Sequence, residues 1–258
     1  MLKMIFLCAT YAGDDPYHAV THTTSNLFDK FEKDNLDKME TKAALTRTSR
    51  RFRRIALEFL FEFLSIKKPK QAVELVKMMK KHSSNSSLRP HEWIKFLFAT
   101  CCTELVTEIL HLCCGLVGFS WAPLASEAKS QRLAAAQDEM ISNIPTNIRF
   151  LRWNRPFQFN TFATFLHKAS ASLQVLYTHG AAVGATLQQP VLRPSYPSLT
   201  HLHVVHLSGF DWLDTVTLDL PELIELSVFC QYSAGNLFPE VFRNASKSLR
   251  VLRLGYYF

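Results

Sequence analysis

Two histidines and a glutamate in the second half of the chain have a spacing that could support metal chemistry. His201 and His203 lie two residues apart, and Glu225 follows His201 by 24 residues. Alternate residues of a strand share one face, so neighbouring strands at this interval would bring Glu225 beside His201. Two imidazoles and a carboxylate can bind a divalent metal ion. Spacing this loose is more typical of a polar surface patch, and we expect neither a bound metal nor a cofactor.

The sequence lacks the motifs that carry common enzyme chemistry. It contains no GxSxG, P-loop, GxGxxG or HExxH sequence, which are signatures of hydrolases, nucleotide-binding proteins and zinc enzymes. Its ten histidines are scattered and have no paired nucleophile nearby in the sequence. We therefore expect that the protein is not an enzyme.

The cysteines are more typical of packing residues than of ligands. They are Cys8, Cys101, Cys102, Cys113, Cys114 and Cys230. No CxxC or Cys/His spacing of a zinc module occurs among them, so we interpret them as reduced thiols, which favours an intracellular protein. No stretch reaches the roughly 18 apolar residues of a membrane helix, and residues 1–12 are marginal for a secretory signal. The expected location is the cytoplasm or the nucleus.

Positive charge is concentrated in residues 41–81. Twelve Lys or Arg stand there against three Glu, within a chain of net charge +7. Such a cluster could neutralise nucleic-acid phosphates, and residues 50–54 could serve in nuclear import. A solvated or partner-facing surface on amphipathic helices is the simpler interpretation. A basic nucleic-acid-binding protein is therefore kept as an alternative.

The elements that would position these side chains follow from a repeated pattern. Blocks of the LxxLxL type occupy residues 148–153, 173–178, 199–204, 223–228 and 249–254. Their starts are 25, 26, 24 and 26 residues apart, which is the period of a leucine-rich repeat. Weaker versions occupy residues 94–99 and 116–121. Because one strand and its return cannot bury an apolar face alone, the pattern predicts an α/β fold, an irregular leucine-rich-repeat solenoid of parallel strands over residues 91–258.

The returns between the blocks differ in kind. Apolar residues recur with a helical period in residues 162–169 and 238–245, and the alanine-rich residues 125–137 also predict a helix. Residues 180–197 and 207–221 contain Pro and Gly without that period and predict loops. The last block ends at Leu254, four residues before the end of the sequence. We expect an exposed apolar end there, truncated, capped by a partner or prone to associate.

Strand alternation also predicts which side chains meet a partner. The leucines of each block point inward, and the residues between them point to the concave face. The candidate target-binding residues are Phe150, Arg152, Val175, Tyr177, His201, His203, Glu225, Ser227, Val251 and Arg253. Aromatic and arginine side chains in such a patch suit a protein-binding surface.

The first third of the chain is organised differently. Residues 1–40 are polar and mixed, and we expect a poorly ordered lead-in. In residues 41–66, apolar side chains recur at three, four and seven residue steps opposite an arginine stripe, which predicts one or two amphipathic helices. Residues 67–90 predict a connecting helix after Pro69 and then a Ser-rich loop.

Residues 44–57 and 59–64 resemble the second half of an F-box, in particular the S-R-R-F/W-R-x-I-A helix of fungal F-box proteins with leucine-rich repeats. Residues 114–121, 196–202 and 248–254 are similar to the repeats of the same group, so the resemblance spans residues 41–258. The opening Leu-Pro-x-Glu-Leu/Ile helix of the family has no counterpart in residues 29–42.

The resemblance implies a substrate receptor of an SCF-type cullin-RING ubiquitin ligase. Its F-box would dock on a Skp-type adaptor, and its repeats would hold a target protein. The implied adaptor-binding residues are Leu45, Ser49, Phe52, Ile55, Ala56 and Leu60. A leucine-rich-repeat scaffold that binds a partner without the adaptor is the alternative.

Overall fold

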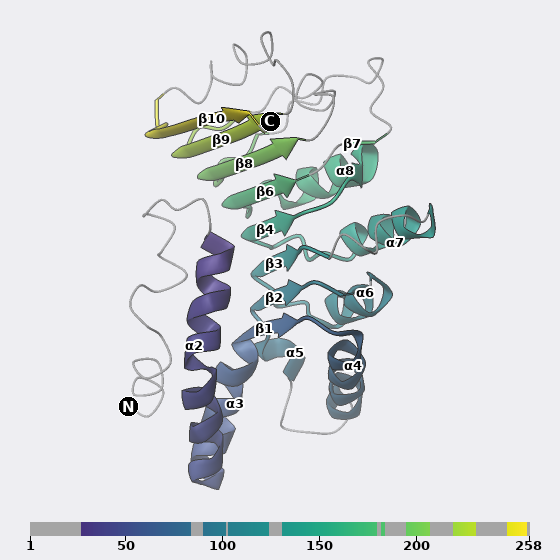
Figure 1. Cartoon of the computed structure of the whole chain (residues 1–258), viewed down its shortest axis with the longest axis vertical. Coiled ribbons are helices and arrows are strands. Elements are labelled where there is room, and N and C mark those ends of the chain that lie inside the picture. Colours follow the sequence, from purple (N-terminus) through teal and green to yellow (C-terminus); the bar gives the residue numbers. More distant parts are fainter. Residues whose placement is uncertain are drawn as a thin grey trace.

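The computed structural model describes residues 27–83, 90–101, 103–123, 131–179, 182–183, 195–206, 219–230 and 247–256. These residues form a mixed α/β structure with seven helices and one open sheet of eight parallel strands (Figure 1). The strand order is β1-β2-β3-β4-β6-β8-β9-β10, so successive strands along the chain lie side by side apart from two short ones. The expected α/β class is confirmed.

Seven of the eight strands of the sheet overlap the sequence blocks, and β1 has no block. They are β1 Phe63–Ile66, β2 Phe96–Ala99, β3 Gly118–Trp121, β4 Phe150–Trp153, β6 Val175–His179, β8 His201–His206, β9 Glu225–Cys230 and β10 Val251–Tyr256. The short strands β5 (Phe157–Gln158) and β7 (Ala182–Val183) pair with each other. Phe150 pairs with Val175, and His201 pairs with Glu225. The register between the later strands therefore equals the interval between the blocks.

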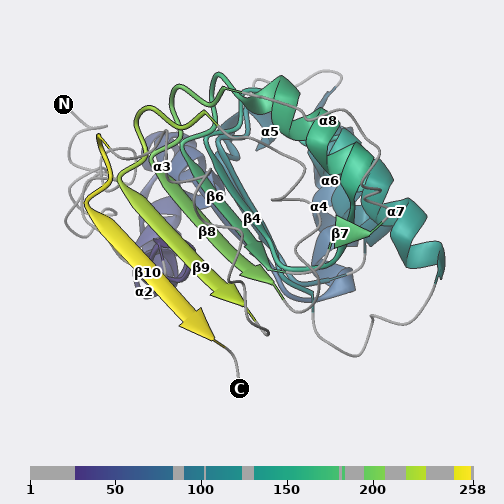
Figure 2. The ribbon, with the colours of Figure 1, turned by 90° about the horizontal axis from the view of Figure 1, so that it is seen from above.

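Helices pack on one side of the sheet and form the main core with it (Figure 2). They are α4 Pro69–Ser83, α6 Thr103–Leu112, α7 Gln131–Ser142 and α8 Phe159–Ala169, with the short α5 Pro90–Trp93 before β2. The inward row of block residues includes Leu151, Leu176 and Leu202, all buried in this core. Trp121 and Trp153 contact each other there, with ring centroids 4.6 Å apart. The predicted inward direction of the leucines is confirmed.

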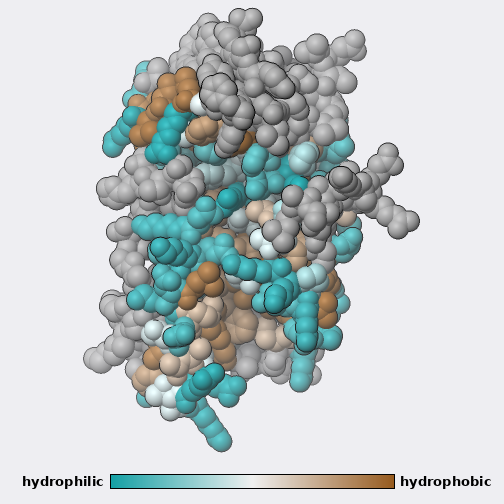
Figure 3. All heavy atoms as spheres, viewed as in Figure 1, coloured by the Kyte–Doolittle hydropathy of each residue, from teal (hydrophilic) through white to brown (hydrophobic). Residues whose placement is uncertain are grey.

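The predicted return helices are present where the structure describes them. Residues 162–169 lie in α8, and the C-terminal part of the alanine-rich segment lies in α7. The expected helix at 238–245 lies outside the described residues, as do most of the two expected loops at 180–197 and 207–221. At the far end of the sheet, Leu252 and Leu254 of β10 are 47% and 55% exposed. Figure 3 shows hydrophobic residues gathered in the region where Figure 1 places β10.

Two helices lie on the other side of the sheet, and the first of them was not expected. α2 (Leu27–Thr48) occupies a region for which the sequence analysis expected poorly ordered chain up to residue 40. Its buried side chains are Phe28, Phe31, Asn35 and Lys42. These positions share one helix face, but two of the four are polar. The apolar signal was therefore too sparse to predict a helix; residues 1–26 lie outside the described residues.

The sequence predicted one or two amphipathic helices in residues 41–66. The structure has parts of two helices there, followed by a strand. α2 ends at Thr48, and α3 (Arg50–Glu62) begins after the N-cap Ser49, whose Oγ accepts a hydrogen bond from the N–H of Phe52 at 3.2 Å. Residues 63–66 form β1, where a helical continuation was expected. Phe63 pairs with Phe96 of β2, so hydrogen bonding to the sheet overrides the helical period at this point.

Candidate functional site

The ten candidate target-binding residues all lie on the α2 side of the sheet. The strand register forms one row of Phe63, Phe96, Gly118, Phe150, Val175, His201, Glu225 and Val251. A second row consists of Ser65, Phe98, Ser120, Arg152, Tyr177, His203, Ser227 and Arg253. The alternation that the sequence predicted thus holds across five strands. Which of these side chains can reach a partner depends on what lies over them.

The N-terminal half of α2 covers the part of this face that β1, β2, β3, β4 and β6 form (Figures 1 and 2). Phe31 makes edge contacts with Phe96 and Phe150, at centroid distances of 5.6 and 6.2 Å. Phe28 contacts Tyr177 in the same way at 5.6 Å. The resulting aromatic cluster contains Phe28, Phe31, Phe63, Phe96, Phe98, Phe150, Val175 and Tyr177. Phe150, Val175 and Tyr177 are therefore core residues beneath a helix, a correction to their expected accessibility on a concave face.

Polar contacts hold α2 in place beside β1. The side chain of Asn35 donates from Nδ2 to the carbonyl oxygen of Phe63 at 3.2 Å, and Lys42 Nζ donates to Asn35 Oδ1 at 2.8 Å. Lys42 is buried, and desolvation lowers the pKa of its ammonium to about 8 although Glu62 acts in the opposite direction. Nearer the start of α2, Glu32 accepts a hydrogen bond from Ser65 Oγ at 2.8 Å. Several independent contacts thus fix the register of this helix on the sheet.

Arg152 is engaged by the first turn of α2. Its Nη1 lies 2.5 Å from Oδ1 of Asp29, and both side chains are partly exposed. The pair joins residues 123 positions apart in the sequence. Arg152 is therefore accessible at the surface, but its guanidinium is already paired with a carboxylate.

Beyond α2, the same two rows change from aromatic to polar. His201, Glu225 and Ser227 are 6%, 3% and 0% exposed. Glu225 Oε1 lies 3.6 Å from Arg253 Nη2, while its Oε2 is buried without a hydrogen-bond partner. These three residues, although expected to contact a target, have little accessible surface. Among the ten candidates, Arg152, His203, Val251 and Arg253 are half-buried and accessible, and the last three lie beyond α2.

Phe229 is also half-buried on this face, although it was not among the residues predicted from the sequence. It lies one position beyond its block, in a third row with His179, Val205 and Gly255. A Cβ at Gly255 would lie 2.4 Å from Cδ1 of Phe229, so the ring lies over this glycine. We call His203, Phe229, Val251, Arg253 and Gly255 the β8–β10 face. None of the described helices packs over it (Figure 1).

The histidines of this region are neutral at pH 7. Burial lowers the pKa of His201 to about 4. Thr200 Oγ1 donates to the carbonyl oxygen of Gln174 at 3.0 Å, so the 2.9 Å contact between His201 Nδ1 and Thr200 Oγ1 has the imidazole as donor. Burial, together with Arg152 and Arg253, lowers the pKa of His203 to about 4. Within the described residues, no cluster of three or more His, Cys, Asp or Glu side chains is arranged to hold a metal ion.

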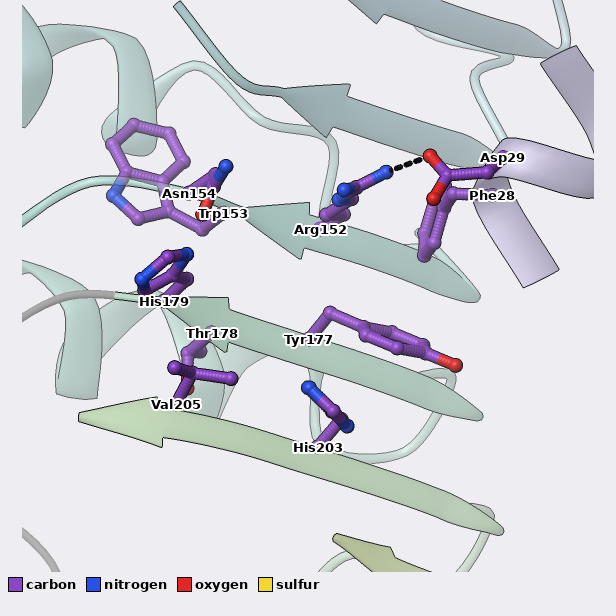
Figure 4. A pocket seen from close by; sticks show the side chains of 10 residues that line it. All are labelled: Phe28, Asp29, Arg152, Trp153, Asn154, Tyr177, Thr178, His179, His203 and Val205. Carbon is purple, nitrogen blue, oxygen red and sulfur yellow. Dashed lines mark hydrogen bonds and ion pairs between the residues drawn. The ribbon is translucent and has the colours of Figure 1, made fainter. Parts of the chain in front are cut away.

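A recess lies at the border between the covered and uncovered parts of the face (Figure 4). Its volume is about 190 Å³, and its lining combines the start of α2 with the ends of β4, β6 and β8. Tyr177 stacks on His203 at a centroid distance of 4.9 Å, and both residues line the recess together with Arg152. His179 and Asp29 were missed as lining residues because one follows its block and the other belongs to a helix that was not expected.

The residues that the F-box resemblance implied for adaptor binding lie in the α2–α3 hairpin. Ala56 is buried together with Phe59, and Leu45, Phe52 and Ile55 pack against them. Ser49 caps α3, and Leu60 is half-buried. Four of the six implied residues therefore contribute to the interior of the hairpin. The exposed side of α3 carries Arg50, Arg51, Arg53 and Arg54 instead.

No protein-family model, curated protein or solved structure matches the chain. The described helices include none that combines the length and the apolar character needed to cross a lipid bilayer.

Proposed function

We propose that the chain is a leucine-rich-repeat solenoid that acts as a non-catalytic protein-interaction module, with the β8–β10 face as its recognition surface. The observation that carries this proposal is the strand register, which places the block residues in continuous rows at the repeat interval. A rigid parallel sheet of this kind presents side chains from separate repeats on one surface, which is how solenoids bind partners. Partner recognition would take place only on the part of that surface that α2 does not cover.

The residue types of the β8–β10 face support a protein partner. Phe229 and Arg253 supply an aromatic ring and a guanidinium, two groups that often dominate protein interfaces. His203 contributes a neutral imidazole that contacts Phe229 at a centroid distance of 5.3 Å. Such a surface offers apolar contact area and hydrogen bonds without a high net charge, which suits a folded or extended protein segment better than a polyanion.

The ubiquitin-ligase role implied by the F-box resemblance is the more specific form of this proposal. In that form, the α2–α3 hairpin docks on a Skp-type adaptor and the β8–β10 face holds the protein to be ubiquitylated. The packing of Leu45, Phe52 and Ile55 inside the hairpin favours the second candidate, a scaffold that binds its partner without the adaptor. Adaptor docking would have to use the exposed side of α3 or a rearranged hairpin.

One experiment separates the two candidates. The full chain is immobilised and mixed with purified Skp-type adaptor, and binding is measured by interferometry. Saturable binding that is weakened by Arg50→Glu/Arg54→Glu supports the receptor role, whereas no binding at micromolar adaptor supports the scaffold.

A second experiment tests recognition itself. Proteins crosslinked to the chain in intact cells are compared between the wild type, Phe229→Ala/Arg253→Gln and the control Arg250→Gln. Arg250 is exposed and its position alternates to the other side of the sheet from Arg253. We expect the double variant to lose specific partners that the control keeps. Equal capture by both variants, or capture abolished by nuclease, would contradict the proposal, and the latter would favour nucleic-acid binding.

A further inference from the structure

The recess beside the β8–β10 face has the size of a single side chain. Its volume of about 190 Å³ is below the roughly 300–1,000 Å³ of typical small-molecule sites. It opens between Phe28 and Asp29 of α2 and the ends of three strands (Figure 4). It lies next to His203, which is shared with the β8–β10 face. A protein that binds this face could therefore insert one side chain into the recess.

The charged side chains that shift the pKa values of the two recess histidines, His179 and His203, are cationic. Arg152 and Arg253 both lower the pKa of His203, after burial as the largest cause. Burial, Arg152 and Arg155 lower the pKa of His179. Two carboxylates lie near these cations, Asp29 at Arg152 and Glu225 at Arg253. Even with both carboxylates present, the arginines dominate at the imidazoles, so the potential in the recess favours an anion.

Arg152 provides the directional contact in the recess. Its Nη1 lies 2.5 Å from Oδ1 of Asp29, so it already holds one carboxylate there, and both side chains are partly exposed. Nδ1 of His203 is buried without a hydrogen-bond partner, and the ring is held between Tyr177 and Phe229. His203 therefore interacts with a bound anion through its charge state and not through Nδ1.

We infer that the recess is a subsite for an acidic side chain of the target protein, with Arg152 as the ion-pairing residue and His179 and His203 in its lining. The inference rests on the proposed function, because the acidic residue belongs to the protein bound on the β8–β10 face. When no target is bound, Asp29 of α2 forms an ion pair with Arg152. The target carboxylate competes with Asp29 for the guanidinium, so the first turn of α2 sets the affinity of the subsite.

The subsite should bind more tightly in mild acid. With the recess empty, the pKa of His203 is about 4, and a bound carboxylate raises it because an opposite charge favours the protonated imidazole. Binding then takes up protons, so the affinity increases as the pH falls from neutrality toward 5.

The test uses the full chain and a single acidic side chain as probe. N-acetylglutamate α-amide is titrated into protein labelled with 13C at histidine Cε1, and the signals are assigned with His179→Gln and His203→Gln. We expect saturable shifts of both signals, with a dissociation constant about threefold lower at pH 5 than at pH 7.5. Arg152→Gln should weaken binding by about tenfold or more, as expected for a lost charge-assisted hydrogen bond. Asp29→Asn should tighten it, a direction that misfolding cannot imitate.

Controls decide whether the site is specific. Arg250→Gln should leave the titration unchanged, and N-acetylglutamine α-amide should cause no saturable shift. Equal shifts with the neutral probe, or no effect of Arg152→Gln and Asp29→Asn, would overturn the inference. If the acidic probe fails to bind while Phe229→Ala/Arg253→Gln still abolishes partner capture, the subsite is wrong and the proposed function stands. If the probe binds but no partner is captured, the proposed function fails separately.

Discussion

The two parts of the α2-side face follow one backbone pattern and differ in what their side chains do. Under α2, five of the ten row positions are aromatic, and Phe96 and Phe150 among them are fully buried. Beyond α2, the same rows carry His201, Glu225 and Arg253. The difference teaches that a repeat pattern specifies the direction of a side chain but not its accessibility. The helix α2 makes three of the ten predicted contact residues, Phe150, Val175 and Tyr177, part of the core.

A local arrangement recurs in both parts and makes the comparison direct. Phe96 lies over Gly118 of the next strand, as Phe229 lies over Gly255. The Phe96 ring is also covered by Phe31 of α2 and stacks on Phe63 at a centroid distance of 4.7 Å. Phe229 is half-buried. The same pair of residue types thus serves packing in one place and offers a contact surface in the other.

Removing the aromatic anchor of α2 should produce the largest effect. Phe31→Ala deletes a buried ring that contacts Phe63, Phe96 and Phe150, and it should lower the free energy of unfolding by about 3–5 kcal/mol. Val251→Ala, in the row of Phe150 but beyond α2, should cost less than about 1 kcal/mol because the side chain is half-buried. Urea denaturation followed by circular dichroism measures both. Similar losses in the two variants would mean that α2 does not divide the face.

The buried Lys42 gives α2 a characteristic dependence on pH. Folding lowers its pKa from 10.5 to about 8, so between these values the unfolded chain holds a proton that the folded chain has lost. The stability of the wild type relative to Lys42→Met should therefore increase by up to about 3 kcal/mol as the pH rises from 8 to 10.5. Lys33→Met, at an exposed position of the same helix, serves as the control. Parallel pH profiles for all three proteins would show that Lys42 is not buried under α2.

The two glycines provide a matched pair of smaller effects. Gly118→Ala places a Cβ 2.3 Å from Cδ1 of Phe96, and that ring is held on both sides, so the variant should lose about 1–3 kcal/mol. Gly255→Ala meets Phe229 at 2.4 Å, but the half-buried ring can swing aside at a cost below about 1 kcal/mol. Calorimetric melting temperatures compare the two. An equal or larger loss in Gly255→Ala would place Phe229 in a packed core.

The smallest effect concerns the ion pair at the border. Asp29→Asn removes the partner of the partly exposed Arg152 and should cost about 0.2–1 kcal/mol at low salt. Because exposed pairs are screened, the difference from the wild type should vanish in 1 M NaCl. Chemical denaturation by urea at both salt concentrations measures it. A loss above about 2 kcal/mol that persists in salt would indicate a buried structural bridge.

The strands, their order and their register could be predicted because LxxLxL blocks at a constant interval leave few alternatives. The leucines must face one core, and the alternation then assigns every intervening residue to the opposite side. β1 was missed because Phe63 to Ile66 also continue the helical period of α3. For such short apolar stretches, periodicity alone does not distinguish a strand from a helix.

The sequence predicted which side of the sheet the candidate residues face, but not which of them are accessible. Nothing in residues 27–48 alone indicates that Phe28 and Phe31 pack against strands that lie more than 100 residues later, such as β4 and β6. A signal was present in the strands themselves, since Phe150 and Tyr177 are apolar where His201, His203 and Glu225 are polar. A row of phenylalanines on a concave face requires a cover.

Hydroxyl-radical footprinting of the intact chain tests the central claim that α2 covers one part of the face and leaves the β8–β10 face accessible. Phe150 and Phe229 have the same intrinsic reactivity and lie on the same side of the sheet, so their labelling rates compare the two parts directly. We predict slow labelling of Phe150 and at least severalfold faster labelling of Phe229, with Phe150 becoming reactive in Phe31→Ala. Equal rates for the two rings in the wild-type protein would contradict the account.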